Sequence, residues 1–460
     1  MKILDYKRYY FLGVGGIGMS ALARYFRHYG KAVAGYDKTR TPLTAELENE
    51  GIAIHYNEDT SFVNRLLEEE GEGNILVVYT PAVPSDHPEY LLFTSRPVRI
   101  MKRSAVLGEI TRQFKTIAIA GTHGKTTTTT MVTHLLRTAG INCFAFMGGI
   151  SKNYNTNLIL GDATREAYVV VEADEYDRSF LTLHPFLAVI TSVDADHLDI
   201  YGDDSHVKEG YQLFAGCLRD GGLLVVKKTV DNELRLSNER LIYSLNLDTE
   251  YRADRVSIEN GAYRYNVVGT LGSVEGVELG MAGMHNVENS VAAVAIAQQL
   301  GIKADVIREA LRSFAGVKRR FDYRLRTSDV VYIDDYAHHP EELRATITSA
   351  RLLYPGKKIT GIFQPHLYSR TRDFAEAFAA SLDLLDECIL LEIYPAREQP
   401  IPGVSSQMLI DLMKIADRKI LTRGEVLESI SAQKRQVILT MGAGDIDQLA
   451  DKIETLLKSN

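Results

Sequence analysis

The chain contains 460 residues, of which only three are cysteines. Cys143, Cys217 and Cys388 are far apart and match neither the spacing of a metal site nor a disulfide framework. Each stands among apolar residues, so we expect three buried thiols that pack as small hydrophobic side chains. The scarcity of cysteine therefore excludes a disulfide-stabilised scaffold and a cysteine-ligated metal site.

Long hydrophobic runs and an excess of positive charge are also absent. No apolar run approaches the roughly 20 residues needed to span a bilayer. The N-terminal segment MKILDYKRYYFLG is a polar start that leads into a strand, not a signal peptide. The formal net charge of −8 gives no electrostatic reason to expect nucleic acid or a membrane as a partner. With 45% hydrophobic and 24% charged residues, the composition is that of a soluble globular protein, and we expect a cytoplasmic one.

Strand-like apolar runs alternate with helix-like segments along nearly the whole chain. This alternation predicts an α/β fold with parallel sheets, and 460 residues exceed one ordinary hydrophobic core. Residues of about 250–282 instead alternate apolar and polar side chains between glycine turns, which indicates a small antiparallel sheet. We predict three α/β domains, covering residues 1–105, 106–315 and 316–460.

Hydrophobic periodicity places the expected elements within these domains. No internal repeat or low-complexity tract interrupts the pattern. Helices are predicted at residues 19–29, 104–112 and 287–300, and one begins in the glycine-rich stretch after residue 120. Strands are predicted at residues 9–12, 32–36, 75–79, 117–120, 168–171, 187–192, 222–226, 330–333, 359–363, 388–392 and 437–441.

The most informative stretch is a glycine-rich loop between an apolar strand and a helix. It has the form Gly-x-x-Gly-Lys-Thr, and Ile119 stands where the general phosphate-binding loop has its first glycine. Backbone N–H groups and Lys125 would hold phosphates, and the Thr126 hydroxyl would hold Mg2+. The alternative is an ordinary turn that caps a helix. The residues predicted to bind nucleotide phosphate are Gly121, Thr122, His123, Gly124, Lys125, Thr126 and Thr127.

A second glycine loop lies near the N-terminus. Gly13, Gly15 and Gly18 match the dinucleotide-binding fingerprint, and Asp37 follows the next strand, where a ribose-binding acid would stand. Taken alone, this pattern predicts an NAD-dependent dehydrogenase. Glycines at a helix N-terminus bind any diphosphate, however, so a nucleotide-sugar fits equally well, and a turn without a ligand is a further alternative. Two nucleotide loops in one chain favour two different phosphate ligands.

Acidic residues follow two apolar strands of the central domain. Glu172 and His197 each come just after a strand, at the edge of a parallel sheet where ligands bind. Carboxylate and hydroxyl oxygens suit Mg2+, and the imidazole would reach a second ion, Mg2+ or Mn2+. Asp174, Glu175, Asp194, Asp196 and Asp199 keep this edge negative. For Glu175 and Asp199 taken singly, we expect solvated residues at strand ends.

Polar groups of the remaining segments allow two interpretations each. Asn286, with His285 and Asn289, either caps a helix or contacts a base or ribose. Arg319 and Arg320 either are surface charges or provide a guanidinium group that binds a γ-phosphate. The loop Asp335–Pro340 and the loop Gln364–Arg372 follow strands of the third domain, and we expect their histidines and arginines to contact a substrate.

Seven motifs occur in order and together resemble the Mur ligases over the whole chain. They begin with the central glycine loop and continue through Glu172-Ala173-Asp174-Glu175 and Asp196-His197. The others are His285-Asn286-x-x-Asn289, Arg319-Arg320-Phe321, Asp335-Tyr336-Ala337-His338-His339-Pro340 and Gln364-Pro365-His366. The resemblance implies an N-terminal Rossmann-like domain for the UDP of the substrate, a central P-loop ATPase domain, and a C-terminal Rossmann-like domain for the amino acid.

The resemblance also implies roles for single residues. Lys125 would bind the β- and γ-phosphates of ATP, Arg320 the γ-phosphate and Asp335 the ribose. Thr126 and Glu172 would hold one Mg2+, and His197 a second. The adenine side would be lined by His285, Asn286 and Asn289. The UDP-sugar would contact Gly15, Gly16, Gly18 and Asp37, and the substrate and alanine region Tyr336, His338, His366 and Arg370.

The implied reaction is ATP-dependent ligation of L-alanine to UDP-N-acetylmuramate through an acyl phosphate, in peptidoglycan precursor synthesis. Such chemistry needs positioned cations rather than a covalent nucleophile, and the chain has no Gly-x-Ser-x-Gly elbow. The same-fold alternative is the ligase that attaches a recycled murein tripeptide. A dehydrogenase and a non-enzymatic nucleotide-binding regulator are the alternatives from other classes. We expect a monomer or a weak homodimer.

Three positions depart from the family pattern. The place of a carbamoylated lysine found in several relatives falls near Gln212, and Lys208 comes too early, so no such modification is predicted. Tyr176 stands where the alanine-ligase form commonly has Ser, and Tyr also occurs there in the tripeptide ligase. Leu367 replaces a usual Arg, which removes one cation from the substrate region.

Overall fold

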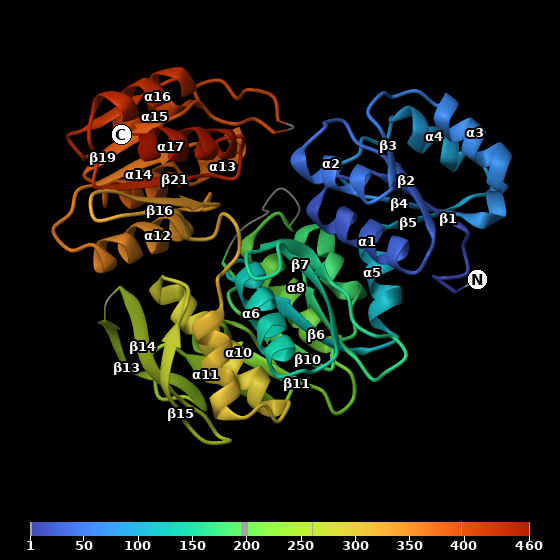
Figure 1. Cartoon of the computed structure of the whole chain (residues 1–460), viewed down its shortest axis with the longest axis horizontal. Helices are drawn as coiled ribbons and strands as arrows, with labels where there is room; N and C mark the ends of the chain where they lie inside the picture. Colours follow the sequence, from blue (N-terminus) through green and yellow to red (C-terminus); the bar gives the residue numbers. More distant parts are fainter. Residues whose placement is uncertain (1, 195–200, 260, 397, 460) are drawn as a thin grey trace. The chain divides into compact units, whose positions relative to one another are not determined.

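The computed structural model describes residues 2–194, 201–259, 261–396 and 398–459. The chain divides into two compact units. The first unit comprises Met1–Asp254, Asn266–Val277 and Asn289–Arg312, and the second comprises Arg255–Tyr265, Glu278–Glu288 and Ser313–Asn460. Each unit contains parallel sheets flanked by helices, as the alternating pattern predicts (Figure 1).

The N-terminal sheet of the first unit has the strand order β3-β2-β1-β4-β5, and its pairs are parallel. This is the order of a Rossmann-type half. The middle strand β1 is buried from Tyr9 onward, and Tyr9 stacks on Phe26 of α1 with centroids 3.8 Å apart. The strands are β1 (Arg8–Leu12), β2 (Ala32–Tyr36), β3 (Ala53–His55), β4 (Ile75–Tyr79) and β5 (Arg99–Lys102). The helices are α1 (Ile17–His28), α2 (Pro42–Asn49), α3 (Ser61–Glu70), η1 (Glu72–Asn74), α4 (Pro88–Thr94) and α5 (Arg103–Thr111).

The central sheet is built around β6, the strand that precedes the predicted phosphate loop. Within the first unit its order is β13-β12-β11-β10-β6-β9-β7-β8. Residues Ile117–Ala120 are fully buried, as expected for an apolar strand covered on both faces. The strands are β6 (Lys115–Ala120), β7 (Cys143–Ser151), β8 (Thr156–Ile159), β9 (Tyr168–Glu172), β10 (Leu187–Ile190), β11 (Leu223–Lys227) and β12 (Arg240–Ser244). The helices are α6 (Lys125–Thr138), η2 (Tyr176–Thr182), α8 (Asp204–Gly216) and α9 (Lys228–Glu233).

The segment predicted as a small antiparallel sheet forms β13 (Tyr251–Glu259), β14 (Ala262–Val268) and β15 (Val274–Leu279). β14 lies between β13 and β15 in the sheet order. The first residues of β13 pair in parallel with β12, Tyr251 beside Tyr243, so these strands extend the central sheet. Two helices follow, α10 (Met284–Gln299) and α11 (Ala304–Ser313).

A buried contact fixes the two sheets of the first unit against each other. Asn157 of β8 is fully buried, and its side-chain amide donates to the carbonyl of Ile17 at 2.6 Å and to Ser20 Oγ at 3.0 Å. Arg24 of the same helix α1 donates to the Asn157 side-chain oxygen at 2.8 Å. The N-terminal turn of α1, next to the first glycine loop, is therefore held on the central sheet.

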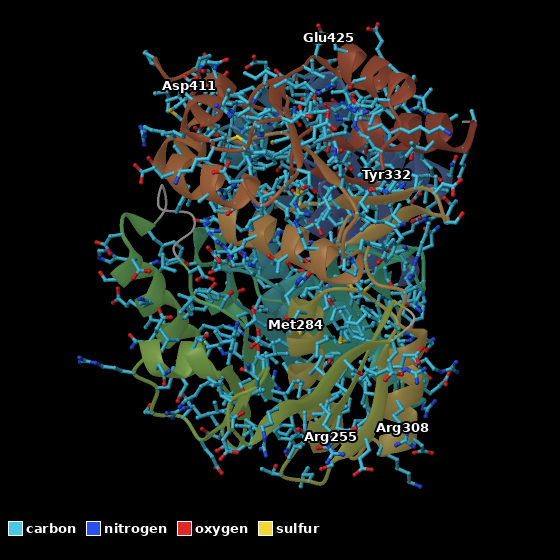
Figure 2. All side chains as sticks on the ribbon, turned by 90° about the vertical axis from the view of Figure 1, so that its left-hand side faces the viewer. Arg255, Met284, Arg308, Tyr332, Asp411 and Glu425 are labelled. Atoms are coloured by element: carbon cyan, nitrogen blue, oxygen red, sulfur yellow. The ribbon has the colours of Figure 1, made fainter. Side chains whose placement is uncertain are left out.

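The C-terminal sheet of the second unit has the order β16-β17-β21-β18-β19-β20. Its pairs are parallel except for the edge pair of β16 with β17. Tyr332 of β17 is fully buried, whereas Asp411 and Glu425 are exposed on helices of the same unit (Figure 2). The strands are β16 (Asp322–Arg326), β17 (Val331–Asp335), β18 (Ile359–Phe363), β19 (Glu387–Leu390), β20 (Arg418–Ile420) and β21 (Val437–Met441). The helices are α12 (Pro340–Leu353), α13 (Tyr368–Asp373), α14 (Ala375–Leu382), α15 (Ser406–Leu412), α16 (Arg423–Ala432) and α17 (Asp447–Ser459).

Two expectations from composition can be compared with the described residues. Cys143 and Cys388 are buried, as predicted, but Cys217 at the end of α8 is partly exposed, so the prediction was wrong for this thiol. Its sulfur lies 3.4 Å from the Leu213 carbonyl of the preceding helical turn. In the part of the chain that the structure describes, no helix is both long enough and apolar enough to cross a membrane.

Candidate active site

The central glycine loop connects β6 to α6, and its glycines are needed for its backbone. Gly121 and Gly124 have φ angles of 132° and 83°, which L-residues with side chains rarely adopt. A Cβ on Gly121 would overlap Thr191 Oγ1 and lie 2.8 Å from Ser192 N. A Cβ on Gly124 would lie 2.8 Å from Asn289 Oδ1. The loop is thus packed against the end of β10 and against Asn289.

Two of the predicted phosphate-binding N–H groups are engaged within the protein. The amide of Thr122 donates to the Ser192 carbonyl at 3.2 Å, and that of His123 to Ser192 Oγ at 2.7 Å. The Thr122 hydroxyl donates to the Asp194 carbonyl at 2.9 Å. Thr126 and Thr127 lie in the first turn of α6, where N–H groups have no partners within the helix. The anion-binding end of the loop is therefore the start of α6.

Lys125 is mostly buried and bonded on several sides. Its Nζ lies 2.8 Å from each carboxylate oxygen of Glu175, 2.6 Å from the Gly121 carbonyl and 3.2 Å from that of Thr122. Burial lowers the pKa of Lys125, but the carboxylates of Glu175, Glu172 and Asp174 outweigh it and hold the pKa above its usual value. Lys125 is therefore a cation paired with Glu175.

Glu175 differs from its prediction. We expected a solvated residue at a strand end, but the residue as a whole is only 3% exposed. The segment after β9 folds back so that the Tyr201 hydroxyl donates to the Glu175 carbonyl at 2.7 Å, and the carboxylate points at Lys125. The prediction was wrong because the buried cation that pairs with this acid lies 50 residues away in sequence.

Glu172 is the last residue of β9, beside the phosphate loop. Its Oε2 accepts a hydrogen bond from Gly148 N at 3.1 Å, and a Cβ on Gly148 would overlap the carboxylate. Thr126 is 6% exposed at the start of α6. Hydroxyl and carboxylate oxygens are the donors that Mg2+ prefers, so these two residues fit the ion.

His197, the third predicted metal ligand, lies outside the described residues, as do Asp196 and Asp199. Among residues 2–194, 201–259, 261–396 and 398–459, no group of three or more His, Cys, Asp or Glu side chains is arranged to hold a metal ion. A site for Mg2+ built on Thr126 and Glu172 would therefore take its remaining ligands from outside this set, such as phosphate oxygens or water.

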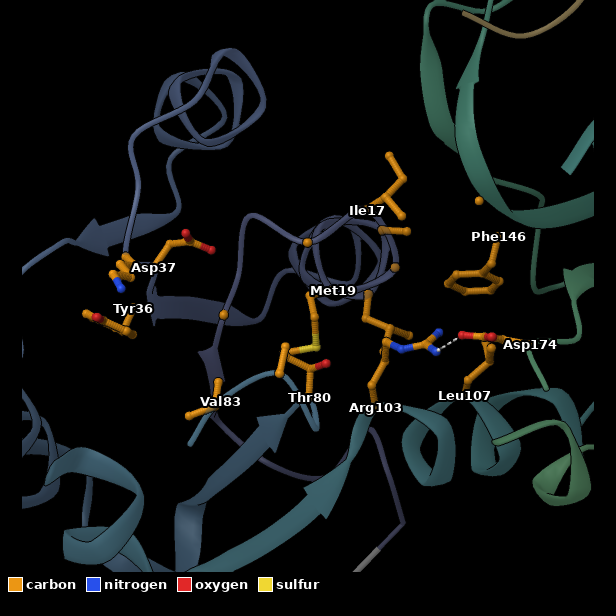
Figure 3. A pocket seen from close by; sticks show the side chains of 18 of the residues that line it. Ile17, Met19, Tyr36, Asp37, Thr80, Val83, Arg103, Leu107, Phe146 and Asp174 are labelled. Atoms are coloured by element: carbon orange, nitrogen blue, oxygen red, sulfur yellow. Dashed lines mark hydrogen bonds and ion pairs between the residues drawn. The ribbon is translucent and has the colours of Figure 1, made fainter. Parts of the chain in front are cut away.

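One cavity of about 540 Å3 connects the first glycine loop with the central sheet (Figure 3). Its lining includes Gly13, Gly16 and Gly18 of the first glycine loop and Glu172 and Asp174 of the central domain. Figure 3 shows Arg103 of α5 with a dashed line to Asp174; Met19 and Thr80 lie on one side of Arg103 and Phe146 on the other. The cavity thus reaches from the first glycine loop to Glu172, although residues 121–127 of the central loop do not line it.

Arg103 is a residue that the sequence reasoning missed. Its Nη2 lies 3.1 Å from Asp174 Oδ2, and a Cβ on Gly18 would lie 3.0 Å from its Nη1. Its guanidinium therefore faces the predicted diphosphate loop from a different element. The available signal was a basic pair, Lys102-Arg103, where a strand meets a helix at the edge of the cavity.

Asp37 shapes the first glycine loop in this structure. Its Oδ2 accepts from Gly15 N at 2.7 Å, and its Oδ1 accepts from Thr39 N at 3.1 Å. Gly15 is not among the cavity-lining residues, whereas Gly16, Gly18 and Asp37 are. His87 also lines this cavity; it is 5% exposed and was not predicted as a site residue.

The predicted substrate residues of the second unit gather at the carboxyl ends of β17 and β18. The guanidinium of Arg320 lies 5.0 Å from the Tyr336 ring centroid and 3.6 Å from Glu342. His338 Nδ1 lies 3.0 Å from the Tyr336 carbonyl, and its ring centroid lies 6.1 Å from that of His366. Four of the predicted residues, Arg320, Tyr336, His338 and His366, thus form one cluster.

Other predicted residues of this unit are enclosed by the fold. Asp335 accepts from Phe321 N at 2.7 Å and from Ala337 N at 2.8 Å, and burial raises its pKa to about 6. Arg370 of α13 is 8% exposed. Arg319 donates to the Gly442 carbonyl at 2.6 Å and pairs with Asp334 at 3.3 Å, so its interpretation as a plain surface charge was wrong.

The three residues expected around adenine are divided between the units. Asn289 belongs to the first unit, beside Gly124, whereas His285 and Asn286 belong to the second. Helix α10 begins at Met284, so Asn286 lies inside it and the N-cap interpretation was wrong. The Asn286 amide donates to the Ala282 carbonyl at 2.6 Å.

Comparison with known proteins gives three family matches in the same order as the predicted domains. Residues 8–115 match the Mur ligase family catalytic domain, residues 119–297 the Mur ligase middle domain, and residues 319–444 the Mur ligase glutamate ligase domain. The predicted domain boundaries at 105 and 315 stay predictions.

Relatives match over almost the full chain. A UDP-N-acetylmuramate–L-alanine ligase of Parabacteroides distasonis is 48% identical, with 97% of this chain and 96% of that protein covered. The enzyme of the same name from Phocaeicola vulgatus is 46% identical, with 99% of both chains covered.

Solved structures agree in fold. The crystal structure of a UDP-N-acetylmuramate-alanine ligase from Thermotoga maritima has a TM-score of 0.83 at 28% identity and covers 98% of this chain and 99% of that chain. A murein peptide ligase from Psychrobacter arcticus has a TM-score of 0.71 at 23% identity, with 99% of both chains covered, and shares the fold. The chain therefore belongs to the Mur ligase family.

Proposed function

We propose that this protein ligates L-alanine to UDP-N-acetylmuramate at the expense of ATP. The observation that carries the proposal is the cavity that runs from the glycine loop of α1 to Glu172 beside the phosphate loop. A UDP-sugar with its diphosphate on the first loop can extend through this space toward the γ-phosphate of ATP on the second. The names of relatives at 46–48% identity over nearly the whole chain support the same substrates.

The phosphates of ATP are assigned to the start of α6. The partial positive charge of the helix N-terminus, the free N–H groups of its first turn and the Lys125 ammonium attract the β- and γ-phosphates. Thr126 and Glu172 would hold Mg2+, which would neutralise charge on the transferring phosphoryl group. We assign Asn289, beside Gly124, to the adenine side together with His285 and Asn286.

The chemistry proceeds in two balanced steps. A carboxylate oxygen of the muramoyl lactyl group attacks the γ-phosphorus, the bond to the β-phosphate oxygen breaks, and ADP leaves. The amine of L-alanine then attacks the acyl phosphate carbonyl, loses a proton, and expels inorganic phosphate. Both steps depend on positioned cations, and the buried Lys125 and the guanidiniums of Arg103 and Arg320 supply them.

The amino-acid end is assigned to the second unit. Arg320, Tyr336, His338 and His366 form a mixed cationic and aromatic cluster at a sheet edge, a common place for ligand binding in α/β folds. We assign Arg320 to binding of the γ-phosphate. Binding of the substrate and of alanine is assigned to Tyr336, His338, His366 and Arg370. Both carboxylate oxygens of Asp335 accept backbone N–H groups, so this side chain holds the loop backbone. Of the assigned residues, Asp335 therefore fits its role, binding of the ATP ribose, least well. A cytoplasmic location and a monomer or weak homodimer stay predictions.

The experiment is a phosphate-release assay with ATP, Mg2+ and UDP-N-acetylmuramate. Release should require L-alanine and yield the UDP-N-acetylmuramoyl-alanine product by mass spectrometry. Release with L-alanyl-γ-D-glutamyl-diaminopimelate but not with L-alanine would replace the proposal with the tripeptide ligase. NADH oxidation without ATP would instead support the dehydrogenase alternative.

A further inference from the structure

The contacts of the Lys125 ammonium group suggest a role for Glu175. An ammonium group has three N–H donors, and four oxygens of the protein lie within 3.2 Å of this one. Two of them are loop carbonyls, so the side chain bends back over its own loop. The hydrogen-bonding capacity of Lys125 is therefore fully used before any phosphate binds.

The pair is shielded from water. The side chains of Lys125 and Glu175 are 13% and 4% exposed, so neither charge is well solvated. A buried carboxylate without a partner is costly, and each of these groups neutralises the other. This differs from the ion pair of Lys115 with Glu166 at the other end of β6, where the side chains are 49% and 74% exposed.

Glu175 is also fixed in place by its own backbone. The Tyr201 hydroxyl donates to its carbonyl at 2.7 Å, and Arg178 N donates to the same carbonyl at 3.0 Å. The acid therefore cannot follow Lys125 freely when the ammonium turns toward a ligand. A phosphate at the start of α6 must compete with this carboxylate for the ammonium.

We propose that Glu175 is the resident counter-ion of the phosphate-loop lysine. It is a positioning residue that holds Lys125 over its own loop. When a nucleotide binds, the lysine exchanges this carboxylate for the phosphates, and it returns to the carboxylate when ADP leaves. The inference rests on the proposed function, because it takes the phosphates of ATP and ADP as the competing anions. Its consequence is that the carboxylate weakens nucleotide binding.

The test is calorimetric titration of the full-length protein with ADP and Mg2+, without the other substrates. Glu175→Gln keeps the side-chain volume and removes the charge, and the Kd for ADP should fall about tenfold. Glu175→Asp retracts the carboxylate and should lower the Kd less. The matched control Glu166→Gln removes the acid of the exposed pair and should leave the Kd within about twofold.

Two further readouts separate this role from a structural one. In the ligase assay, Glu175→Gln should lower the KM for ATP without raising kcat, whereas damage to the fold would raise KM. In the ligand-free protein, acylation of Lys125, followed by peptide mass spectrometry, should be faster in Glu175→Gln than in wild type. If Glu175→Gln is unstable, the Kd for ADP, the KM for ATP and the acylation rate are compared between Glu175→Asp and wild type instead.

The outcomes are distinct. An unchanged or higher Kd for ADP in a folded Glu175 variant, with wild type binding normally, overturns the counter-ion role and leaves the ligase proposal intact. A wild-type protein that binds no ADP overturns the proposed function, and the counter-ion role fails with it.

Discussion

The two glycine loops of the first unit have the same strand–loop–helix arrangement, but the cation beside each loop comes from a different place. Each follows a buried parallel strand and opens a helix. In the central loop the cation, Lys125, is the first residue of that helix. In the N-terminal loop the cation, Arg103, comes from α5, a different element. The central loop therefore carries its cation within its own helix, whereas the N-terminal loop is faced by a cation from a second element.

The partners of these cations are neighbours in sequence. Arg103 pairs with Asp174, and Lys125 pairs with Glu175. The Arg103 pair is more exposed, with side chains 21% and 38% accessible. We therefore expect changes at the central loop to have the larger effects.

The largest effect is expected for Lys125→Ala. Turnover should fall by roughly three orders of magnitude or more, because the γ-phosphoryl transition state loses its fixed cation. Binding of UDP-N-acetylmuramate, measured by calorimetry, should be retained. Loss of that binding in a folded Lys125→Ala protein would contradict the separation of the two loops. The control is Lys115→Ala, at the start of β6, the strand that precedes the loop.

Replacing one glycine of each loop with alanine should show which loop needs a glycine for its backbone conformation. Gly121→Ala combines a φ of 132° with overlap at Thr191, and should lower the free energy of unfolding by about 2–4 kcal/mol. Gly16 has a φ of −64°, and its nearest neighbour would lie 3.6 Å from a new Cβ, so Gly16→Ala should change stability by less than about 1 kcal/mol. Denaturant unfolding measures both, and equal losses would show that the loops do not differ.

Arg103→Ala tests the cation of the N-terminal loop. The KM for UDP-N-acetylmuramate should rise about 10- to 100-fold, since a charged hydrogen bond to a diphosphate is lost. The KM for ATP should stay within about threefold. An equal rise in both would indicate that Arg103 supports the fold of the whole unit, and Arg112→Ala, an exposed arginine of the same region, is the control.

The smallest effect is expected for Asp174→Asn. Removing the partner of Arg103 should change the KM for UDP-N-acetylmuramate by about two- to fivefold, because the pair is partly exposed. The Kd for ADP should be nearly unchanged, in contrast to Glu175→Gln. A larger effect on ADP than on the UDP-sugar would reverse the assignment of the two acids to the two loops.

Strands, loops and motif residues could be predicted because their signals are local. The strands at 32–36, 75–79, 359–363 and 437–441 have the predicted bounds, since continuous apolar runs end at glycines or polar turns. The short strands β3, β5 and β20 were missed because three or four residues at a sheet edge carry no such run.

Long-range pairings were the part that sequence reasoning could not supply. Glu175 was expected to be solvated, because nothing near it in sequence shows that Lys125 lies beside it. Arg103 was missed because its importance comes from the distant Gly18 and Asp174. The N-cap interpretation of Asn286 was wrong because the helix was predicted to start at residue 287, whereas α10 starts at Met284. A difference of a few residues turns a capping position into an internal one.

The pairing of β6 with β9 has a consequence for the spacing between the phosphate loop and the acidic segment after β9. Ile119 stands opposite Glu172 in this parallel pair, so the phosphate loop and the acidic segment leave adjacent strands at the same level. Neighbouring strands are about 4.8 Å apart whatever their side chains. The spacing between the phosphate loop and Glu172 is therefore a property of the sheet rather than of the loop sequence.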